Sequence, residues 1–318
     1  MILQILILII GFILLIKGAD VFVDGASCTA RHLRISKKFI GLTIVAFGTS
    51  APEFAVSLKS MMVGSGDIVL GNVIGSNILN ILLILGIGAS IYPITIKDNT
   101  VKKEIPLCLI SSVLLLVLFL DGLFNGSSYD TLSRGDALAI LLVFSIFLYY
   151  IFSIARNKTD SKVKEDEIKY GVLKSIILII IGLAGIIFGS DMVVNSATKI
   201  AEYIGISQRI ISLTIIALGT SLPELATTIS SSLKKEQDIL VGNIIGSNIF
   251  NICFVLGLPV ALCGEITSNS FNYIDSIFFI LAPILLYLFS RRTYKLGKLE
   301  GISLILLFLV YYMLVFIF

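Results

Sequence analysis

The sequence predicts an all-α membrane protein of ten transmembrane helices, folded as two inverted five-helix repeats with broken helices at a polar centre. Three observations support this. The chain is 57% hydrophobic and 14% charged, and apolar runs of about 20 residues are typical of bilayer spans. Residues 36–86 match residues 207–257 without a gap at an offset of 171, with 26 of 51 positions identical, which indicates an internal duplication. Each copy also sets a glutamate, hydroxyls and an asparagine inside an apolar stretch, where a charge is costly and rarely kept without a use.

Ten apolar runs follow one another along the chain. The first five lie near 1–30, 39–63, 68–92, 105–120 and 136–155. The other five lie near 171–198, 210–233, 239–262, 273–290 and 300–318. We therefore divide the chain into a first five-helix repeat (1–155), a cytoplasmic linker (156–170) and a second, inverted five-helix repeat (171–318). Because each repeat has an odd number of spans, the second copy enters the membrane from the opposite side.

The basic residues test this arrangement. If successive loops alternate between the two sides of the membrane, 19 of the 24 lysines and arginines fall on one side. Basic loops stay in the cytoplasm, so the linker is expected there and both termini are expected to be extracytoplasmic. The net charge of +3 is then explained by the basic residues of the cytoplasmic loops, and we predict no nucleic-acid partner from it.

The second run of each repeat contains the string Gly-Thr-Ser-x-Pro-Glu. Proline lacks an N–H and clashes with the preceding turn, so the helix should break at Pro52 and at the equivalent Pro223. Backbone carbonyls freed at membrane depth are tolerated where protein or a water-lined cavity satisfies them, and a bound cation would also do so. Glu53 follows the proline, and Ser50 lies three residues earlier on the same helical face. Both offer the hard oxygen ligands that Ca²⁺ and Na⁺ prefer.

The third run begins with the sequence Gly71-Asn72-Val73-Ile74-Gly75-Ser76-Asn77. Glycines four residues apart let another backbone approach closely, and Ser76 shares a helical face with Asn80. If that face meets the broken second run, the polar residues of both repeats converge near the midplane. Hydroxyls and small residues also simply pack helices together, and this alternative stays open for Ser76 and Asn72. It suits Glu53 and Glu224 poorly, because an unpaired buried carboxylate would stay neutral or be excluded.

At these residues the chain resembles the cation/calcium exchanger family, most closely its prokaryotic sodium/calcium exchangers. Both family motifs are present twice, as GTSAPE with GNVIGSNILN and as GTSLPE with GNIIGSNIFN. The resemblance implies an antiporter that exchanges Na⁺ for Ca²⁺ by alternating access, with the first and sixth helices, here 1–30 and 171–198, sliding as a gate. It also implies a metal site made of Glu53, Glu224, Thr49, Thr220, Ser50, Ser221, Ser76, Ser247, Asn80 and Asn251, with Ala46 and Ala217 as carbonyl donors.

Two features narrow this expectation. Some relatives, including potassium-dependent exchangers, carry an aspartate where this chain has Asn80 or Asn251, so the amides disfavour potassium co-transport. They leave two carboxylates at the centre, which neutralise one Ca²⁺ or two Na⁺. The linker at 156–170 is too short for the large calcium-sensing domains that animal exchangers insert there.

We therefore expect an integral protein of a prokaryotic cell membrane that works as a monomer in the lipid bilayer. No enzymatic activity, cofactor or protein partner is expected, and Ca²⁺ and Na⁺ are the expected substrates. The four cysteines, Cys28, Cys108, Cys253 and Cys263, form no CxxC pair and are interpreted as packing residues.

Three other functions remain as alternatives. A calcium/proton antiporter of the same superfamily is the nearest, because the sequence does not say which coupling ion competes at Glu53 and Glu224. A channel is the second. The third, an intramembrane aspartyl protease, rests on the GxGD string at 64–67 and the YD string at 129–130, which occur in reversed order and at predicted span ends. Substrate-dependent flux of Na⁺ or H⁺ would separate an exchanger from a channel or a protease.

Overall fold

The computed structural model describes the chain except for residues 34, 157–169, 206–216, 269–272 and 318. Its first half forms α1 (Ile2–His32), α2 (Lys37–Ile40), the π-helix η1 (Gly41–Val45), α3 (Ala46–Thr49), α4 (Ala51–Met62), α5 (Gly66–Leu79), the π-helix η2 (Asn80–Ile84), α6 (Leu85–Ile91), β1 (Ile94–Thr95), the π-helix η3 (Thr100–Glu104), α7 (Ile105–Phe119), α8 (Asp121–Phe124), β2 (Asp130–Leu132) and α9 (Arg134–Arg156). Its second half forms α10 (Val172–Tyr203), α12 (Ala217–Gly219), α13 (Leu222–Leu233), α14 (Gln237–Phe250), the π-helix η6 (Asn251–Leu256), α15 (Gly257–Cys263), β3 (Ile266–Ser268), α16 (Tyr273–Thr293), β4 (Lys295–Leu296) and α17 (Lys298–Ile317).

Helices dominate, as the apolar runs predict. Within the described residues, seven are long and apolar enough to cross a membrane, or eight if the bent pair Lys37–Thr49 and Ala51–Met62 is one span. The sequence predicts ten. Of the remaining runs, 105–120 contains α7, which has only 15 residues, and 210–233 lies partly outside the described residues. The predicted linker at 156–170 also lies almost wholly outside them.

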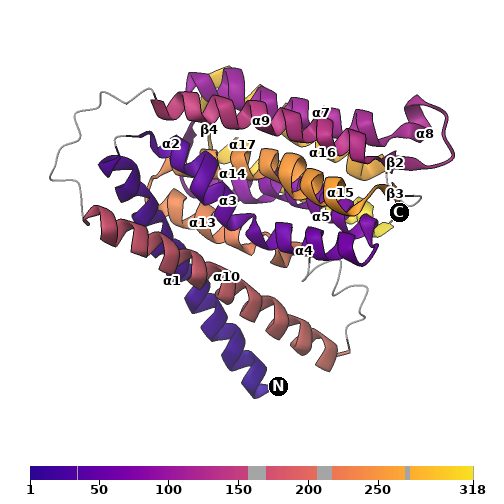
Figure 1. The fold of residues 1–318 in the computed structure, drawn as a ribbon. Coiled ribbons are helices and arrows are strands. Elements are labelled where there is room, and N and C mark those ends of the chain that lie inside the picture. Colours follow the sequence, from indigo (N-terminus) through magenta and orange to yellow (C-terminus); the bar gives the residue numbers. More distant parts are fainter. Residues whose placement is uncertain (34, 157–169, 206–216, 269–272, 318) are drawn as a thin grey trace.

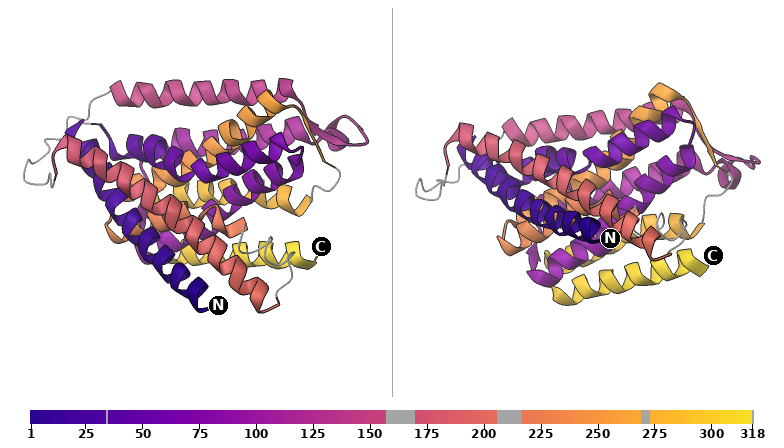
Figure 2. Two further views of the ribbon diagram at one scale, coloured as in Figure 1. Left: turned by 60° about the horizontal axis from the view of Figure 1, so that its bottom comes forward. Right: turned by 90° about the horizontal axis from the view of Figure 1, so that it is seen from below.

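The two longest helices, α1 and α10, cross on one side of the molecule (Figure 1) and remain side by side in the other views (Figure 2). Glycines form the crossing: a Cβ at Gly18 would lie 2.8 Å from the backbone nitrogen of Ile186, and one at Gly25 would lie 2.8 Å from the carbonyl oxygen of Ser175. One at Gly11 would lie 3.1 Å from the Gly189 carbonyl oxygen. Residues later in α1 therefore contact residues earlier in α10, so the two helices run antiparallel.

The described residues are mostly helical, as predicted, with four short strands that the all-α prediction did not include. Strands β1 and β4 pair antiparallel, and so do β2 and β3. Figure 1 places β4 at one end of the helices and β2 with β3 at the other. The duplication offset of 171 maps Thr95 of β1 onto Ile266 of β3, so equivalent segments of the two copies lie at opposite ends of the molecule. Each strand has only two or three residues, too short for a periodic sequence signal.

The centre of the molecule is made by the third helix of each predicted repeat. In the apolar windows of these spans, 94% of the residues are buried for α14 to α15 and 72% for α5 to α6, but only 22% for α1 and 28% for α10. The close backbone approach predicted at Gly71 and Gly75 is wrong, because a Cβ at either would meet no atom within 4 Å. Their equivalents in the second repeat, Gly242 and Gly246, do make such an approach. A Cβ at Gly242 would lie 2.9 Å from the Leu42 nitrogen, and one at Gly246 would lie 3.0 Å from the Leu42 Cα. The bend between α3 and α4 is thereby held against α14.

Candidate functional site

Each Gly-Thr-Ser-x-Pro-Glu string breaks a helix, as predicted. In the first copy α3 ends at Thr49, α4 begins at Ala51, and the two parts are bent by 45°. In the second copy α12 ends at Gly219 and α13 begins at Leu222. The break residues, Ser50 (φ −84°, ψ 4°) and Ser221 (φ −93°, ψ 7°), share nearly the same backbone conformation. Each new helix then carries its glutamate in the first turn, where the positive end of the helix dipole favours a carboxylate.

The two breaks meet each other. The Ser50 hydroxyl donates to Oε1 of Glu224 at 3.0 Å, and the Ser221 hydroxyl donates to Oε1 of Glu53 at 3.3 Å. The two bonds are equivalent under the duplication, because each serine reaches the glutamate of the other copy. Both glutamates have 0% exposure. The structure therefore brings two carboxylates from distant parts of the sequence into one buried network.

The third helix of each copy completes this network. The Ser247 hydroxyl donates to Oε1 of Glu224 at 3.4 Å and lies 3.5 Å from the Thr49 hydroxyl. The amide of Asn251 donates to the Ser76 hydroxyl at 3.1 Å. Asn80 and Asn251 each begin a π-helical stretch, η2 and η6. Single π-turns inside α-helices occur frequently at functional sites, and the apolar pattern of the sequence gives no sign of them.

Four oxygens of the predicted ligand residues have no hydrogen-bond partner among the described residues. They are Oε2 of Glu53, Oε2 of Glu224, Oδ1 of Asn80 and Oδ1 of Asn251, all buried. Leaving a buried acceptor unpaired costs about 1–3 kcal/mol, and more when it is charged. Two carboxylate and two amide oxygens, left free in equivalent positions of the two copies, are the hard ligands that Ca²⁺ and Na⁺ take in proteins.

Three other predicted ligands, Ala46, Thr220 and Ala217, are less closely tied to the network. Ala46 is buried, and its carbonyl accepts the Ser50 N–H at 3.0 Å. Thr220 is partly exposed, and no hydrogen bond among the described residues joins its side chain to the network. Only the backbone of Ala217 is described, as the first residue of α12. Within the described part of the chain no three His, Cys, Asp or Glu side chains cluster, so the carboxylate count at this site stays at two.

Four more asparagines contribute to the network, and the sequence reasoning underrated them. Asn248 accepts from the Asn80 amide at 3.0 Å and donates to the Asn77 carbonyl at 3.4 Å. Asn243 links Thr49 to α13. Asn72, for which simple packing was left open as an alternative, donates to the Glu53 carbonyl oxygen at 3.1 Å. The available signal was their identity in both copies, at 72 and 243 and at 77 and 248.

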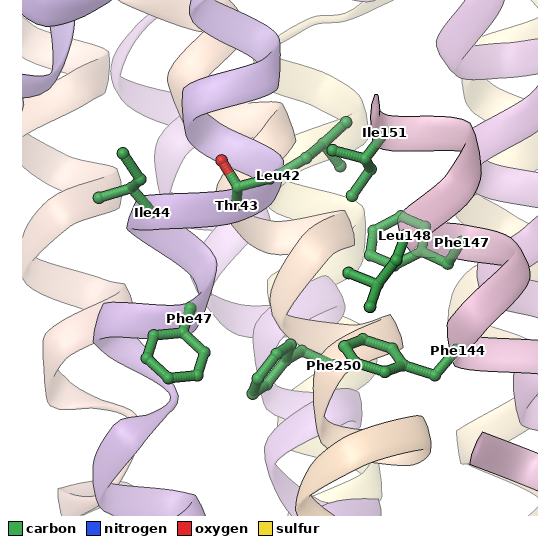
Figure 3. Close-up of a pocket in the computed structure, with 9 residues that line it drawn as sticks. All are labelled: Leu42, Thr43, Ile44, Phe47, Phe144, Phe147, Leu148, Ile151 and Phe250. Carbon is green, nitrogen blue, oxygen red and sulfur yellow. The ribbon is translucent and has the colours of Figure 1, made fainter. Parts of the chain in front are cut away.

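A cavity of about 290 Å³ lies beside this network and is not part of it (Figure 3). It is lined by Leu42, Thr43, Ile44, Phe47, Phe144, Phe147, Leu148, Ile151 and Phe250. The single hydroxyl in the lining, that of Thr43, already donates to the Phe39 carbonyl at 2.7 Å. The cavity therefore offers no free oxygen to an ion.

Comparison with known proteins agrees with this geometry. The family model described as "Sodium/calcium exchanger protein" matches residues 3–153 and 174–317. The chain belongs to the sodium/calcium exchanger family. It is 39% identical to the inner membrane protein YrbG of Escherichia coli over 96% of this chain and 94% of that protein. It is 30% identical to the sodium/calcium exchanger MaX1 of Methanosarcina acetivorans over 98% of each.

Solved structures extend the likeness to three dimensions. A structure of the sodium-calcium exchanger NCX_Mj matches with a TM-score of 0.84 and 32% identity, covering 98% of this chain and 97% of that one. The likeness thus covers nearly the whole length of these relatives, two of which are named as sodium/calcium exchangers. The family resemblance seen in the motifs is confirmed.

Proposed function

We propose that this protein is a secondary antiporter that exchanges Na⁺ for Ca²⁺ across the membrane by alternating access. The observation behind the proposal is the reciprocal pair of buried glutamates, each with one oxygen bonded to a serine of the other copy and one oxygen without a partner. Two carboxylates in low dielectric require cationic compensation. One Ca²⁺ or two Na⁺ would supply it, and any further Na⁺ would add net positive charge, as an electrogenic cycle requires.

We assign the ions to the predicted oxygen set. The ligands are Glu53, Glu224, Thr49, Thr220, Ser50, Ser221, Ser76, Ser247, Asn80 and Asn251, with the carbonyls of Ala46 and Ala217. Because Ca²⁺ and Na⁺ would share these oxygens, each must weaken the apparent affinity of the other. Competition of this kind keeps the carboxylates neutralised whenever the protein changes conformation.

The architecture we propose is ten helices in two inverted repeats, 1–155 and 171–318, joined by a cytoplasmic linker. Two features support it: equivalent strands lie at opposite ends of the molecule, and α1 runs antiparallel to α10. Inverted repeats with a site at their interface are the usual construction of secondary transporters. We place the protein in a prokaryotic cell membrane as a monomer, with both termini extracytoplasmic.

The gate we propose consists of α1 and α10. Their crossing is made by glycines, which let the two backbones approach closely at this point. Near the site the pair contacts the broken helices through the Ser190 hydroxyl, which donates to the Gly219 carbonyl at 3.0 Å. Sliding of the pair past Gly219 would expose the ions to one side of the membrane at a time.

The test is Ca²⁺ uptake into sodium-loaded proteoliposomes by wild type, Glu53→Gln and Glu224→Gln. Two unit charges about 4 Å apart at an effective dielectric of about 20 attract by about 4 kcal/mol, and a divalent ion doubles this. Replacing one glutamate by glutamine removes this attraction, and losing even half of it lowers Ca²⁺ affinity about a thousandfold. Both variants should therefore abolish uptake while remaining folded, and wild-type exchange by either would remove the core of the proposal.

The matched control is Glu104→Gln. Glu104 has 0% exposure, like the two site glutamates, but it pairs with Lys38 at 2.7 Å away from the ion network. The folded fraction of Glu104→Gln should have the same half-saturating Ca²⁺ concentration as the wild type. Repeating the wild-type assay with a proton gradient in place of sodium separates Na⁺ exchange from the calcium/proton alternative. Uptake driven by the proton gradient alone would decide for the latter.

A further inference from the structure

Asn243 lies between the broken helices of the two copies. It belongs to α14 and is 1% exposed. Its Oδ1 accepts from the Thr49 hydroxyl at 3.1 Å, and its Nδ2 donates to the Thr227 hydroxyl at 3.1 Å. Thr49 ends α3 in the first copy, and Thr227 lies in α13 one turn after Glu224 in the second. The side chain therefore bridges the two halves of the molecule.

The hydroxyl of Thr227 sets the direction of this bridge. It has one hydrogen, which it gives to the carbonyl of Pro223 at 2.8 Å or of Glu224 at 3.1 Å. Its oxygen is then free to accept, so the Asn243 amide directs Nδ2 toward Thr227 and Oδ1 toward Thr49. An amide orientation is fixed by its hydrogen-bond network in this way.

The hydroxyl of Thr49 has several possible acceptors for its single hydrogen. Oxygens of Val45 (3.0 Å), Asn243 (3.1 Å), Ala46 (3.4 Å) and Ser247 (3.5 Å) all lie within reach. A helical threonine ordinarily bonds back to the carbonyl three or four residues earlier. Donation to Asn243 instead leaves the Ala46 carbonyl with only the Ser50 N–H at 3.0 Å, and a carbonyl oxygen has a second lone pair to offer.

We propose that Asn243 is a positioning residue that draws the Thr49 hydrogen away from the α3 backbone, so that the Thr49 hydroxyl and the Ala46 carbonyl can both bind the ion. This inference rests on the proposed exchange function. The equivalent residue of the first copy does something different: Asn72 is only half-buried and donates to Glu53 O and to the Ser57 hydroxyl within its own repeat. Identical residues thus have different roles in the two halves.

A double-mutant cycle tests the inference, with Asn243→Leu removing the bridge at similar volume and Thr49→Ala removing the hydroxyl. The first readout is the half-saturating Ca²⁺ concentration for Na⁺-driven exchange. The second is the rise in unfolding temperature on adding Ca²⁺ to detergent-solubilised protein, which needs no transport. Because Asn243 acts through Thr49, each single change should weaken the Ca²⁺ response about tenfold and the double variant no more than the larger single effect.

The control cycle pairs Asn243→Leu with Thr220→Ala, the equivalent threonine of the other copy. The structure gives no bond between Asn243 and Thr220, so their effects should multiply. If the effects of Asn243→Leu and Thr49→Ala on the Ca²⁺ response also multiplied, the inference would be overturned. A wild-type Ca²⁺ response in Asn243→Leu would overturn it too. If Asn243→Leu does not fold, Asn243→Ser serves in the same two cycles. A wild type without any Ca²⁺ response would instead refute the exchange function.

Discussion

Replacing Asn251 by aspartate adds a third carboxylate to the centre, and the structure predicts how the protein accommodates it. The Asn251 amide now donates to the Ser76 hydroxyl at 3.1 Å. That hydroxyl donates to the Val73 carbonyl at 3.2 Å, and it can rotate to donate to a carboxylate instead. The side chain can therefore be changed without losing its partner.

The added charge is harder to accommodate. Like charges about 5 Å apart at an effective dielectric of about 20 repel by about 3 kcal/mol, which corresponds to about a hundredfold change in an equilibrium constant. The site relieves this by binding a proton or another cation. Na⁺-driven Ca²⁺ exchange by Asn251→Asp should therefore depend on pH far more steeply than wild-type exchange, with lower activity or an altered response to K⁺. A pH profile identical to wild type would mean that Asn251 does not face the ions.

The matched variant is Asn80→Asp at the equivalent position. The Asn80 amide donates to Oδ1 of Asn248, an acceptor that cannot turn into a donor. Aspartate there would face that oxygen with another acceptor and cost about 1–3 kcal/mol in addition to the charge repulsion. Asn80→Asp should thus unfold at a lower temperature than Asn251→Asp in detergent. Equal unfolding temperatures would contradict the assigned hydrogen bonds. Asn72→Asp is not a neutral control, because Asn72 holds the Glu53 backbone.

Three further outcomes are expected. A reporter fused to the C-terminus should be extracytoplasmic and one inserted at 156–170 cytoplasmic, because the basic loops share one side; a cytoplasmic C-terminus would overturn the span count. Lys38→Met should lower the free energy of unfolding by about 3–5 kcal/mol, because it leaves the buried Glu104 carboxylate without its cationic partner. A melting curve unchanged from wild type would contradict this. Asn248→Ala should weaken Ca²⁺ binding by the solubilised protein more than Asn77→Ala does, because Oδ1 of Asn248 accepts the hydrogen bond from the Asn80 amide. Equal losses of Ca²⁺ affinity would contradict this role of Asn248.

The parts of the fold that the sequence predicted follow from local chemistry. Proline disfavours continuation of a preceding helix, so breaks were expected at Pro52 and Pro223. They lie two residues earlier, at Ser50 and Ser221, and each proline stands in the first turn of the new helix. The duplication then required the two breaks to be alike. The π-turns at Asn80 and Asn251 and the four short strands could not be foreseen, since neither leaves a period in the apolar pattern.

The site itself was predictable as a list of residues but not as a set of bonds. Which serine bonds which glutamate depends on how the two copies meet, and no spacing within one copy encodes that contact. The crossed bonds from Ser50 to Glu224 and from Ser221 to Glu53 belong to the tertiary structure alone. The same holds for Asn243, whose two partners lie on different copies.

The buried asparagines, which are the same in both repeats, make different contacts in the two halves. Asn80 bonds Oδ1 of Asn248, and the equivalent pairing would join Asn251 to Oδ1 of Asn77. Asn251 bonds Ser76 instead, and Oδ1 of Asn77 is a buried oxygen without a partner among the described residues. Inverted repeats that alternate between two conformations must differ at any moment, since one half faces outward as the other faces inward. Under the alternating access that we propose, the unequal asparagine contacts are a difference of the kind expected between the two halves in a single state.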